Sequence, residues 1–366
     1  MKVVILANHC LGLISFRKEL LETLISEKYE VVVCIPKDDR ENELRIMGCR
    51  IIPTVHLARR SVNPMKDVAL LREYRNIIEK EKPNVVLTYT IKPNVYGGIV
   101  CTSLNIPYIV NITGLGTAVE NSGILQKLTL KLYKAAMCKV GCIFFQNQGN
   151  RDFFQKYNIQ PSKHRIIPGS GVNLERFVRQ PYPNGDKIKF LFISRLMKEK
   201  GIEEYFVAAE YFTSIRSDVE FHILGVCEDD YNMKLKELTD EGIIIYHGLQ
   251  ADIRPFLKSS SCLIHPTFYP EGMSNVILEA AASGRPVITT LRYGCKEAVE
   301  DGKTGFLFPE KNTSALIECI DKFLQLSPQQ RARMGEQGRQ KMESEFDRQI
   351  VVRAYLEEIN KAVRIN

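Results

Sequence analysis

The stretch His265-Pro-Thr-Phe-Tyr-Pro-Glu271-Gly-Met-Ser-Asn-Val-Ile-Leu-Glu279 decides the fold, because it reads as a strand, a loop and a helix in succession. Apolar residues 262–265 predict a buried strand, and the helix predicted over 274–283 ends where Gly284 can adopt a left-handed conformation. The first amides of such a helix have no internal acceptors, so they attract anions or hydroxyl oxygens. With Glu271 before the helix and Glu279 within it, the segment suits a ligand rich in hydroxyl groups.

A second strand, loop and helix carries cations in place of carboxylates. Residues 188–194 predict a buried strand, and Arg195, Lys198 and Lys200 follow it before a helix that begins at Ile202. In an open α/β sheet, ligands bind at the carboxyl ends of the strands. Two isolated glutamates would most simply be solvated surface residues. The added basic loop favours a site for a sugar diphosphate instead.

Together the motifs Ser194-Arg-Leu-Met-Lys-Glu-Lys200-Gly201 and Glu271-x7-Glu279 resemble the signature of the family-four retaining glycosyltransferases of the GT-B fold. Within that family the chain is most similar to the branch that builds capsular polysaccharide and lipid-linked glycans. The motifs of that branch are Thr90-Ile-Lys92-Pro93, Thr113-Gly114-Leu115-Gly116 and Gly169-Ser-Gly171-Val172-Asn173-Leu-x-x-Phe177. Because they occur in order over most of the chain, the set is more specific than any single motif.

Alternating strands and helices predict an α/β fold with parallel sheets. The resemblance implies two Rossmann-like, doubly wound domains that face an interdomain cleft. We expect an acceptor domain over residues 1–168, a linker over 169–185 and a nucleotide-sugar donor domain over 186–345. By resemblance, the C-terminal helix, within residues 346–366, completes the first domain.

The expected elements follow the hydrophobic pattern. In the first half, strands are predicted at 3–7, 31–35, 50–55, 84–89, 108–112 and 141–146, with helices at 15–26, 64–81, 94–104, 124–139 and 150–157. In the second half, strands are predicted at 188–194, 220–225, 243–248, 261–265, 286–289 and 305–309, with helices from 202 and at 314–325, 328–343 and 349–362.

Bulk composition is that expected of a soluble globular protein, and the cysteines indicate the cytosol. The 366 residues are 45% hydrophobic and 25% charged, which is enough for two packed domains. The ten cysteines show no metal-ligand spacing, and most lie in apolar runs, so we expect reduced core thiols. No apolar run reaches the roughly 18 residues that a membrane-spanning helix needs. The apolar start of the chain is broken at Asn8, so we interpret it as a strand and not a signal peptide.

Charge is uneven along the chain. Residues 1–165 carry a net charge of +10 and the remainder −3. The basic half is expected to face an anionic lipid surface or a diphosphate-linked acceptor, and nucleic acid is disfavoured because no aromatic-and-basic binding motif is present. On the helix predicted at 124–139, Lys127, Lys131 and Lys134 lie opposite an apolar side formed by Leu125, Leu128, Leu132, Ala135 and Ala136. This helix predicts peripheral binding to the inner face of the cell membrane; an ordinary surface helix with solvated lysines is the alternative.

The resemblance implies a role for each motif residue. Arg195 and Lys200 would stabilise the departing diphosphate, and Glu279 would accept hydrogen bonds from the ribose hydroxyls. Glu271 and the amides of Gly272, Met273, Ser274 and Asn275 would hold the transferred sugar. In the front-face mechanism assigned to the family, a donor phosphate oxygen takes the acceptor proton, so Glu271 would position the sugar and act electrostatically. No Asp-x-Asp pair is present, so we expect neither a catalytic metal nor a cofactor.

Weaker candidates come from the loops after other strands. By resemblance, Gly12, Gly248 and Leu249 would contact the donor, and His9, Thr113 and Gly114 would lie on the acceptor side. A purely structural role for His9 and for the turn at 113–116 is an equally open interpretation. His265 is interpreted as a packed residue at the end of its strand.

The resulting hypothesis is a retaining, metal-independent glycosyltransferase that moves a hexose or N-acetylhexosamine from a UDP-sugar. The acceptor would be a polyprenyl-diphosphate-linked saccharide in surface polysaccharide or glycan assembly. The alternatives are a UDP-sugar 2-epimerase on the same fold and an inactive sugar-nucleotide-binding protein. A nicotinamide-dependent oxidoreductase is disfavoured, because Asn8-His-Cys-Leu-Gly12 follows the first strand where G-x-G-x-x-G would be needed.

Overall fold

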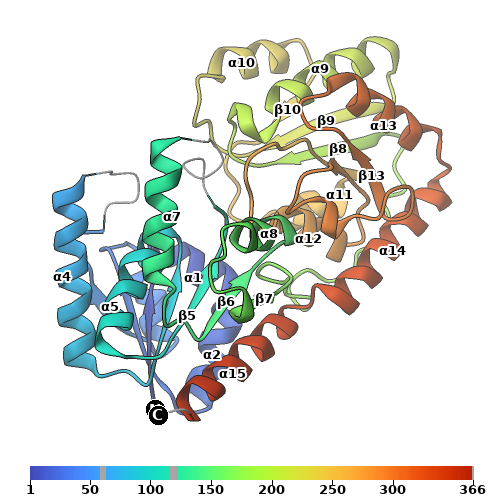
Figure 1. Ribbon diagram of the computed structural model, residues 1–366. Helices are drawn as coiled ribbons and strands as arrows, with labels where there is room; N and C mark the ends of the chain where they lie inside the picture. Colours follow the sequence, from blue (N-terminus) through green and yellow to red (C-terminus); the bar gives the residue numbers. More distant parts are fainter. Residues whose placement is uncertain (58–62, 116–122, 365–366) are drawn as a thin grey trace. The chain divides into compact units, whose positions relative to one another are not determined.

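The computed structural model describes residues 1–57, 63–115 and 123–364, and they form two compact units (Figure 1). Unit 1 comprises Met1–Gly171, Pro270–Met273 and Arg348–Asn366. Unit 2 comprises Val172–Tyr269 and Ser274–Asp347. The short segment Pro270–Met273 therefore belongs to unit 1, although unit 2 residues precede and follow it in the chain.

Unit 1 is built on a seven-stranded parallel sheet with the order β3-β2-β1-β4-β5-β6-β7. Its strands are β1 (Lys2–Leu6), β2 (Glu30–Ile35), β3 (Arg50–Pro53), β4 (Val85–Tyr89), β5 (Tyr108–Ile112), β6 (Cys142–Phe145) and β7 (His164–Ile166). Leu6 pairs with Cys34 on one side and with Thr88 on the other, so β1 and β4 form the centre of the sheet.

Both faces of this sheet are covered by helices, which is why its strands are almost continuously apolar (Figure 1). One face packs on α1 (Cys10–Phe16), α2 (Lys18–Ser26), α3 (Glu41–Ile46) and α15 (Arg348–Arg364). The other packs on α4 (Pro64–Glu81), α5 (Gly98–Leu104), α7 (Ile124–Ala136) and α8 (Gln148–Lys156). Successive residues of each strand alternate between the two cores: Val3 and Ile5 face the first, Val4 and Leu6 the second.

The last helix, α15, is fixed to unit 1 by its first residue. The Arg348 guanidinium is 3.0 Å from the Glu19 carboxylate and also donates to the carbonyls of Ser15 and Gly171. Further along α15, the Tyr355 hydroxyl accepts a hydrogen bond from Asn111 at 2.6 Å.

Unit 2 is built on a six-stranded parallel sheet with the order β10-β9-β8-β11-β12-β13. Its strands are β8 (Ile188–Ile193), β9 (Val219–Leu224), β10 (Ile245–Tyr246), β11 (Cys262–His265), β12 (Val287–Thr290) and β13 (Gly305–Phe308). Its helices are α9 (Ile202–Ile215), α10 (Asn232–Asp240), α11 (Arg254–Ser259), α12 (Asn275–Ala282), α13 (Thr313–Gln325) and α14 (Pro328–Glu345).

The predicted α/β class with two parallel sheets is confirmed, while several local predictions were wrong. The helix predicted at 15–26 is two helices, because the chain breaks at Arg17, whose buried guanidinium stacks 5.2 Å from the Tyr89 ring. The helix predicted at 94–104 begins with a π-helix, Pro93–Gly97. Neither α3 nor β7 was predicted, because six and three residues of mixed polarity carry too little periodic signal.

Candidate functional site

Two cations of unit 2 are brought together on one aromatic ring. Arg195 follows β8, and its guanidinium lies 5.6 Å from the centre of the Tyr269 ring. The ammonium group of Lys200 lies 4.7 Å from the same ring centre. Arg195 also donates to Glu228 at 2.7 Å. Cation–π attraction to this ring thus holds side by side the two residues that are predicted to bind the diphosphate.

Lys200 is held in place by the backbone around it. It is 7% exposed and ends the 3₁₀ helix Lys198–Lys200. The next residue, Gly201, has a φ of +78°, and a Cβ there would lie 2.6 Å from the carbonyl carbon of Pro266. Glycine is therefore required where this loop meets the chain after β11. The Phe268 amide donates to Glu199 O at 2.9 Å, which joins the same two segments.

The start of α12 is fixed by a histidine that the sequence analysis treated only as packing. Ser274 is the N-cap residue of α12, and its hydroxyl is 3.0 Å from His265 Nε2. His265 is 1% exposed at the end of β11. The Ser274 amide donates to Gly294 O at 2.8 Å. A loop carbonyl therefore accepts from this amide, and the role of Ser274 in holding the donor sugar stays a prediction. Glu279 lies half-buried on α12, one turn beyond Asn275.

A small pocket of about 160 Å³ lies at the carboxyl ends of β8 and β9. It is lined by Ile193, Ser194, Arg195, Leu224, Gly225, Val226, Leu249, Gln250 and Ile253. The Gly225 amide donates to Gly248 O at 2.9 Å, and Gly248 has a φ of +65°. This turn leaves Leu249 75% exposed at the pocket. Arg195 and Leu249, predicted from separate segments, therefore line one pocket.

A chain of polar side chains leads to Gln250, one of the residues that line this pocket. Glu220 lies 3.2 Å from His222 Nε2, and His222 Nδ1 lies 2.9 Å from His247 Nε2. The two imidazole planes differ by 4°, the geometry of an N–H···N hydrogen bond. Burial lowers the pKa of both histidines and favours their neutral forms. The Gln250 side chain donates to His247 O, so this chain ends at the segment that carries Leu249. This pairing has no signal in the sequence, because it depends on the register of β9 and β10.

Glu271 and Gly272 lie in the segment that belongs to unit 1. Asn147 Nδ2 donates to the carbonyls of Glu271 at 3.1 Å and Gly272 at 2.6 Å. A Cβ on Gly272 would lie 2.5 Å from Gln146 Oε1 and closer still to Thr113 O. A Cβ on Gly114 would lie 3.2 Å from Pro270 O. The structure therefore brings the predicted acceptor-side residues Thr113 and Gly114 beside the donor-loop residues Glu271 and Gly272. Met273 is buried and packs under Gly169. Gly116, the last residue of the predicted turn, lies outside the described residues.

Gly12 and His9 do not lie in an open loop: Gly12 is part of α1, and His9 caps its amino terminus. Residues 10–16 form α1, and His9 is its N-cap residue, with ring Nδ1 accepting from the Gly12 amide at 3.0 Å. A Cβ on Gly12 would lie 2.9 Å from His9 Cε1. The expectation of an open loop was wrong, because this cap starts the helix at Cys10. His9 thus has a capping role, and Gly12 is small because an imidazole ring lies against it.

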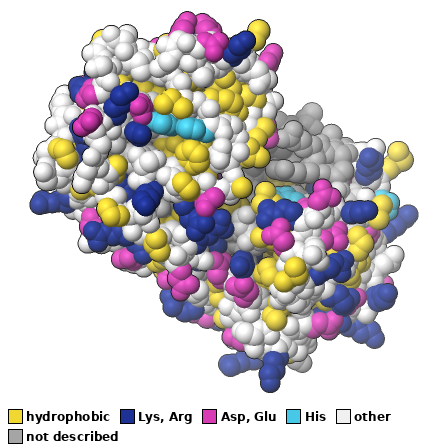
Figure 2. Space-filling view, turned by 180° about the vertical axis from the view of Figure 1, so that it is seen from behind, with side chains coloured by type: hydrophobic (Ala, Val, Ile, Leu, Met, Phe, Trp, Pro, Cys, Tyr) yellow, Lys and Arg dark blue, Asp and Glu magenta, His cyan; other side chains and the backbone are white. Residues whose placement is uncertain are grey.

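The surface of α7 also differs from prediction. Lys127, Lys131 and Lys134 are exposed as expected, yet Leu128 is 53% exposed and Ala135 is exposed too. The buried side of α7 is formed by Leu130, Tyr133 and Ala136, so the helix is rotated relative to the predicted apolar side. On the face drawn in Figure 2, Lys and Arg side chains are interspersed with Asp and Glu. The exposed side of α7 therefore combines three cations with an apolar leucine.

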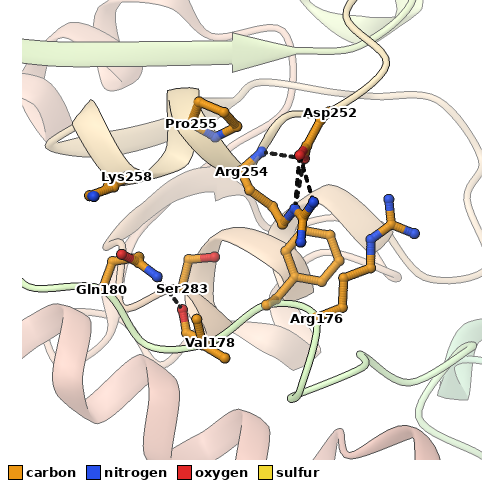
Figure 3. Close-up of a pocket in the computed structure, with 9 residues that line it drawn as sticks. Arg176, Val178, Gln180, Asp252, Arg254, Pro255, Lys258 and Ser283 are labelled. Carbon is orange, nitrogen blue, oxygen red and sulfur yellow. Dashed lines mark hydrogen bonds and ion pairs between the residues drawn. The ribbon is translucent and has the colours of Figure 1, made fainter.

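A separate pocket of about 440 Å³ in unit 2 is lined by the segment from Arg176 to Gln180, by residues 252–258 and by Ser283 (Figure 3). Its main charged feature, Arg254, turns onto the Asp252 carboxylate with nitrogen–oxygen distances of 2.7–3.0 Å. Lys258 projects from α11 on another side of the pocket (Figure 3). This pocket has a lining distinct from that of the predicted donor residues.

Among the described residues, no cluster of three or more His, Cys, Asp and Glu side chains has the arrangement of a metal site. Across the same residues, every helix is too short or too polar to cross a membrane.

Comparison with known proteins gives matches along nearly the whole chain. Residues 2–147 match the family model "Glycosyl transferase 4-like", and residues 175–341 match "Glycosyl transferases group 1". A Campylobacter jejuni protein named N,N'-diacetylbacillosaminyl-diphospho-undecaprenol alpha-1,3-N-acetylgalactosaminyltransferase is 23% identical over the full length of both chains. An Escherichia coli protein named UDP-Gal:alpha-D-GlcNAc-diphosphoundecaprenol alpha-1,3-galactosyltransferase is 27% identical over 71% of each chain.

The fold is shared with solved structures. Anabaena Alr3699/HepE in complex with UDP superposes with a TM-score of 0.80 over 99% of this chain and 100% of that one, at 18% identity. The first family match lies within unit 1, and the second covers most of unit 2 together with the unit 1 segment Pro270–Met273. The chain belongs to the GT-B glycosyltransferases, with a glycosyl transferase 4-like region followed by a glycosyl transferases group 1 region.

Proposed function

We propose that the protein transfers a hexose or N-acetylhexosamine from a UDP-sugar to a polyprenyl-diphosphate-linked saccharide, with retention of configuration and without a metal ion. The observation that carries this proposal is the pair of cations on the Tyr269 ring, Arg195 and Lys200, one of which lines the 160 Å³ pocket. Two positive charges next to a pocket fit a nucleoside diphosphate.

Each part of the UDP moiety has a matching group in unit 2. The pocket between Gly225 and Leu249 would take the uracil base, with the exposed Leu249 side chain covering one face of the ring. Glu279 would accept the ribose hydroxyls. Arg195 and Lys200 would hold the diphosphate, and the Arg195–Glu228 hydrogen bond would keep the guanidinium oriented before the donor arrives.

The chemistry follows from where the charge develops. Departure of the diphosphate places negative charge on its oxygens, and Lys200, 7% exposed, acts there with little screening by water. These protein cations would supply the field that a metal supplies in other transferases. A phosphate oxygen of the donor would accept the proton of the attacking hydroxyl. Glu271, three residues before the N-cap Ser274, would orient the sugar as its ring becomes positively charged.

The acceptor class is inferred from the relatives. The printed names of two of them describe transfer to sugars linked to diphospho-undecaprenol, and one name specifies a UDP-sugar donor. A lipid-linked acceptor requires access to a membrane surface. Lys127, Lys131 and Lys134, with the exposed Leu128, would provide it on unit 1 by binding anionic head groups. The protein would then work as a peripheral enzyme on the cytoplasmic face.

The donor site is tested by UDP binding, measured as the shift in melting temperature and by calorimetry. Replacing a residue that makes a charge-assisted hydrogen bond costs about 1.5–3 kcal/mol, so Lys200→Met and Glu279→Gln should each weaken UDP at least about tenfold. Lys258→Ala is the matched control, because it removes an exposed cation of the same unit from a different pocket. Equal UDP affinity in wild type and both site variants would contradict the donor site.

Turnover tests the rest of the proposal. With wild-type protein, a UDP-sugar panel and α-GlcNAc-diphosphoundecaprenol, UDP release should require the acceptor and persist in EDTA. The anomeric configuration of the product, read by NMR, should match that of the donor. Loss of activity in EDTA would contradict the metal-free mechanism, and conversion of the donor without an acceptor would indicate an epimerase. Reversing the charge of Lys127, Lys131 and Lys134 should reduce cosedimentation with anionic vesicles while leaving UDP affinity unchanged.

A further inference from the structure

The centre of the unit 1 sheet is a topological switch point. The chain proceeds from β1 outward to β2 and β3, then returns to β4 on the other side of β1 and continues outward to β7. In open parallel sheets, ligands bind outside the carboxyl ends of the strands where the winding reverses. In unit 1 this position is the carboxyl ends of β1 and β4, which lead to Asn8 and Thr90.

Thr90 has a backbone conformation that its side chain disfavours. Its φ is +72°, in the left-handed region, where a β-branched residue is an outlier. Strain of this kind persists only when the surroundings enforce it, and it concentrates at functional sites. The π-helix Pro93–Gly97 follows at once, and such segments are also frequent at functional sites.

The surroundings of Thr90 do enforce its conformation. Asn94 is 1% exposed and is held by two hydrogen bonds of 2.8 Å, one from the Thr88 hydroxyl and one to Asn111 O. The Asn94 amide donates to Thr90 O at 2.9 Å. On the other side, Lys92 forms a 2.8 Å ion pair with Asp67 of α4. These contacts fix the turn from both sides, so the direction of the Thr90 side chain is set before any ligand binds.

Two polar atoms at this switch point lack a hydrogen-bond partner among the described residues: Asn8 Oδ1 and Thr90 Oγ1, both shielded from solvent. Leu6 pairs with Thr88, the last pair between β1 and β4, so Asn8 and Thr90 each follow two residues after it at the same edge of the sheet. A shielded polar group without a partner is costly, which favours a ligand that completes it. One amide carbonyl and one hydroxyl at the same edge of the sheet suit hydroxyl groups of a sugar.

We infer that Asn8 and Thr90 form a saccharide subsite of unit 1, which binds the sugar that receives the transferred residue. Asn8 Oδ1 accepts from one hydroxyl of the acceptor sugar, and Thr90 Oγ1 exchanges a hydrogen bond with another. This inference rests on the proposed function, because it names the residues that select the acceptor for the same reaction. The strain at Thr90 holds its hydroxyl in the direction that the sugar requires.

The experiment measures binding of α-GlcNAc-diphosphoundecaprenol in detergent micelles, with undecaprenyl diphosphate lacking the sugar as the comparison ligand. Asn8→Ala and Thr90→Val should each lower the affinity for the sugar-bearing ligand by about three- to tenfold, the effect of losing one neutral hydrogen bond. Thr90→Ser keeps the hydroxyl and should bind within about twofold of wild type. UDP affinity should be unchanged in all three variants. In turnover, the acceptor KM should rise while the donor KM stays constant.

A second pair of variants separates sugar binding from folding. Thr90→Gly removes both the backbone strain and the hydroxyl. It should therefore lower the affinity for the acceptor without lowering the melting temperature. Asn105→Gly is its matched control, because Asn105 also has a left-handed φ, +56°, but caps α5 away from the switch point. The inference is overturned if Thr90→Val and Asn8→Ala bind the acceptor like wild type. It is equally overturned if wild type binds the sugar-bearing and sugar-free lipids equally. Absence of UDP binding by wild type would instead contradict the proposed function.

Discussion

Gly272→Ala tests the packing of the segment between Pro270 and Met273. The added methyl would lie 2.5 Å from Gln146 Oε1 and closer to Thr113 O, whereas ordinary contact begins near 3.4 Å. Thr113 O is backbone directly after β5 and cannot rotate away, so the segment must move by about 1 Å. Overpacking of this kind costs about 1–3 kcal/mol. For a unit of this size, that loss corresponds to a decrease in melting temperature of roughly 2–12 °C.

Gly272→Ala should also lower kcat. Glu271 precedes the substituted residue, and a shift of about 1 Å in a positioning group can reduce kcat by up to about 100-fold. UDP affinity should stay within about twofold, since Arg195, Lys200 and Glu279 lie outside the shifted segment. Differential scanning fluorimetry, UDP calorimetry and a UDP-release assay measure the three quantities. Gly185→Ala is the matched control, because its Cβ would meet nothing closer than 3.9 Å. A Gly272→Ala protein with wild-type melting temperature and kcat would refute the reasoning.

Three further variants test stability. A hydrogen bond from Arg50 lowers the pKa of Glu81 to about 2 from its ordinary value of 4.5, so this carboxylate stabilises the fold above pH 4.5 and loses that effect as the pH falls toward 2. Glu81→Gln should lower the free energy of unfolding by roughly 2–3 kcal/mol at pH 7 and weaken its decrease at acid pH, both measured by urea unfolding. An unchanged decrease at acid pH would contradict the assignment. Ser274→Ala should lose about 1–3 kcal/mol, seen as a lower melting temperature, by depriving the buried His265 of this hydroxyl, and Ser274→Thr should restore most of it. Arg348→Ala should cost about 3–5 kcal/mol and expose α15 to limited proteolysis, because the ion pair with Glu19 and the hydrogen bonds to the Ser15 and Gly171 carbonyls are lost; unchanged protease resistance would count against this anchor.

Most of the fold was predictable because its strands are strong local signals. Segments such as Val31–Ile35 are continuously apolar, and parallel sheets buried on both faces produce that pattern. The side of α7 that packs was predicted wrongly, because leucines and alanines occur around much of its circumference and only tertiary contact selects Tyr133 and Leu130 as the buried residues. Likewise, the break at Arg17 depends on Tyr89 and Tyr355, which are distant in sequence.

The sequence predicts that two site residues lie close together only where both follow the end of the same strand. The motif containing Arg195 and Lys200 located the cations, but not the ring of Tyr269 that pairs them 69 residues later. The His222–His247 hydrogen bond depends on strand register, and the link from His265 to Ser274 depends on how the loop after β11 folds back. None of these contacts produces a periodic pattern in the sequence. The sequence therefore shows which residues are present but not which of them contact one another.

The placement of Pro270–Met273 in unit 1 has a thermodynamic consequence. These four residues are continuous with β11 and α12 of unit 2, yet Asn147 and Gln146 of unit 1 hold or crowd their backbone. Under the proposed function, a donor sugar held by Glu271 would lie next to the peptide groups that border Thr113 and Gly114. If donor binding changes the affinity for a ligand beside Thr113 and Gly114, linkage requires that ligand to change donor affinity by the same factor.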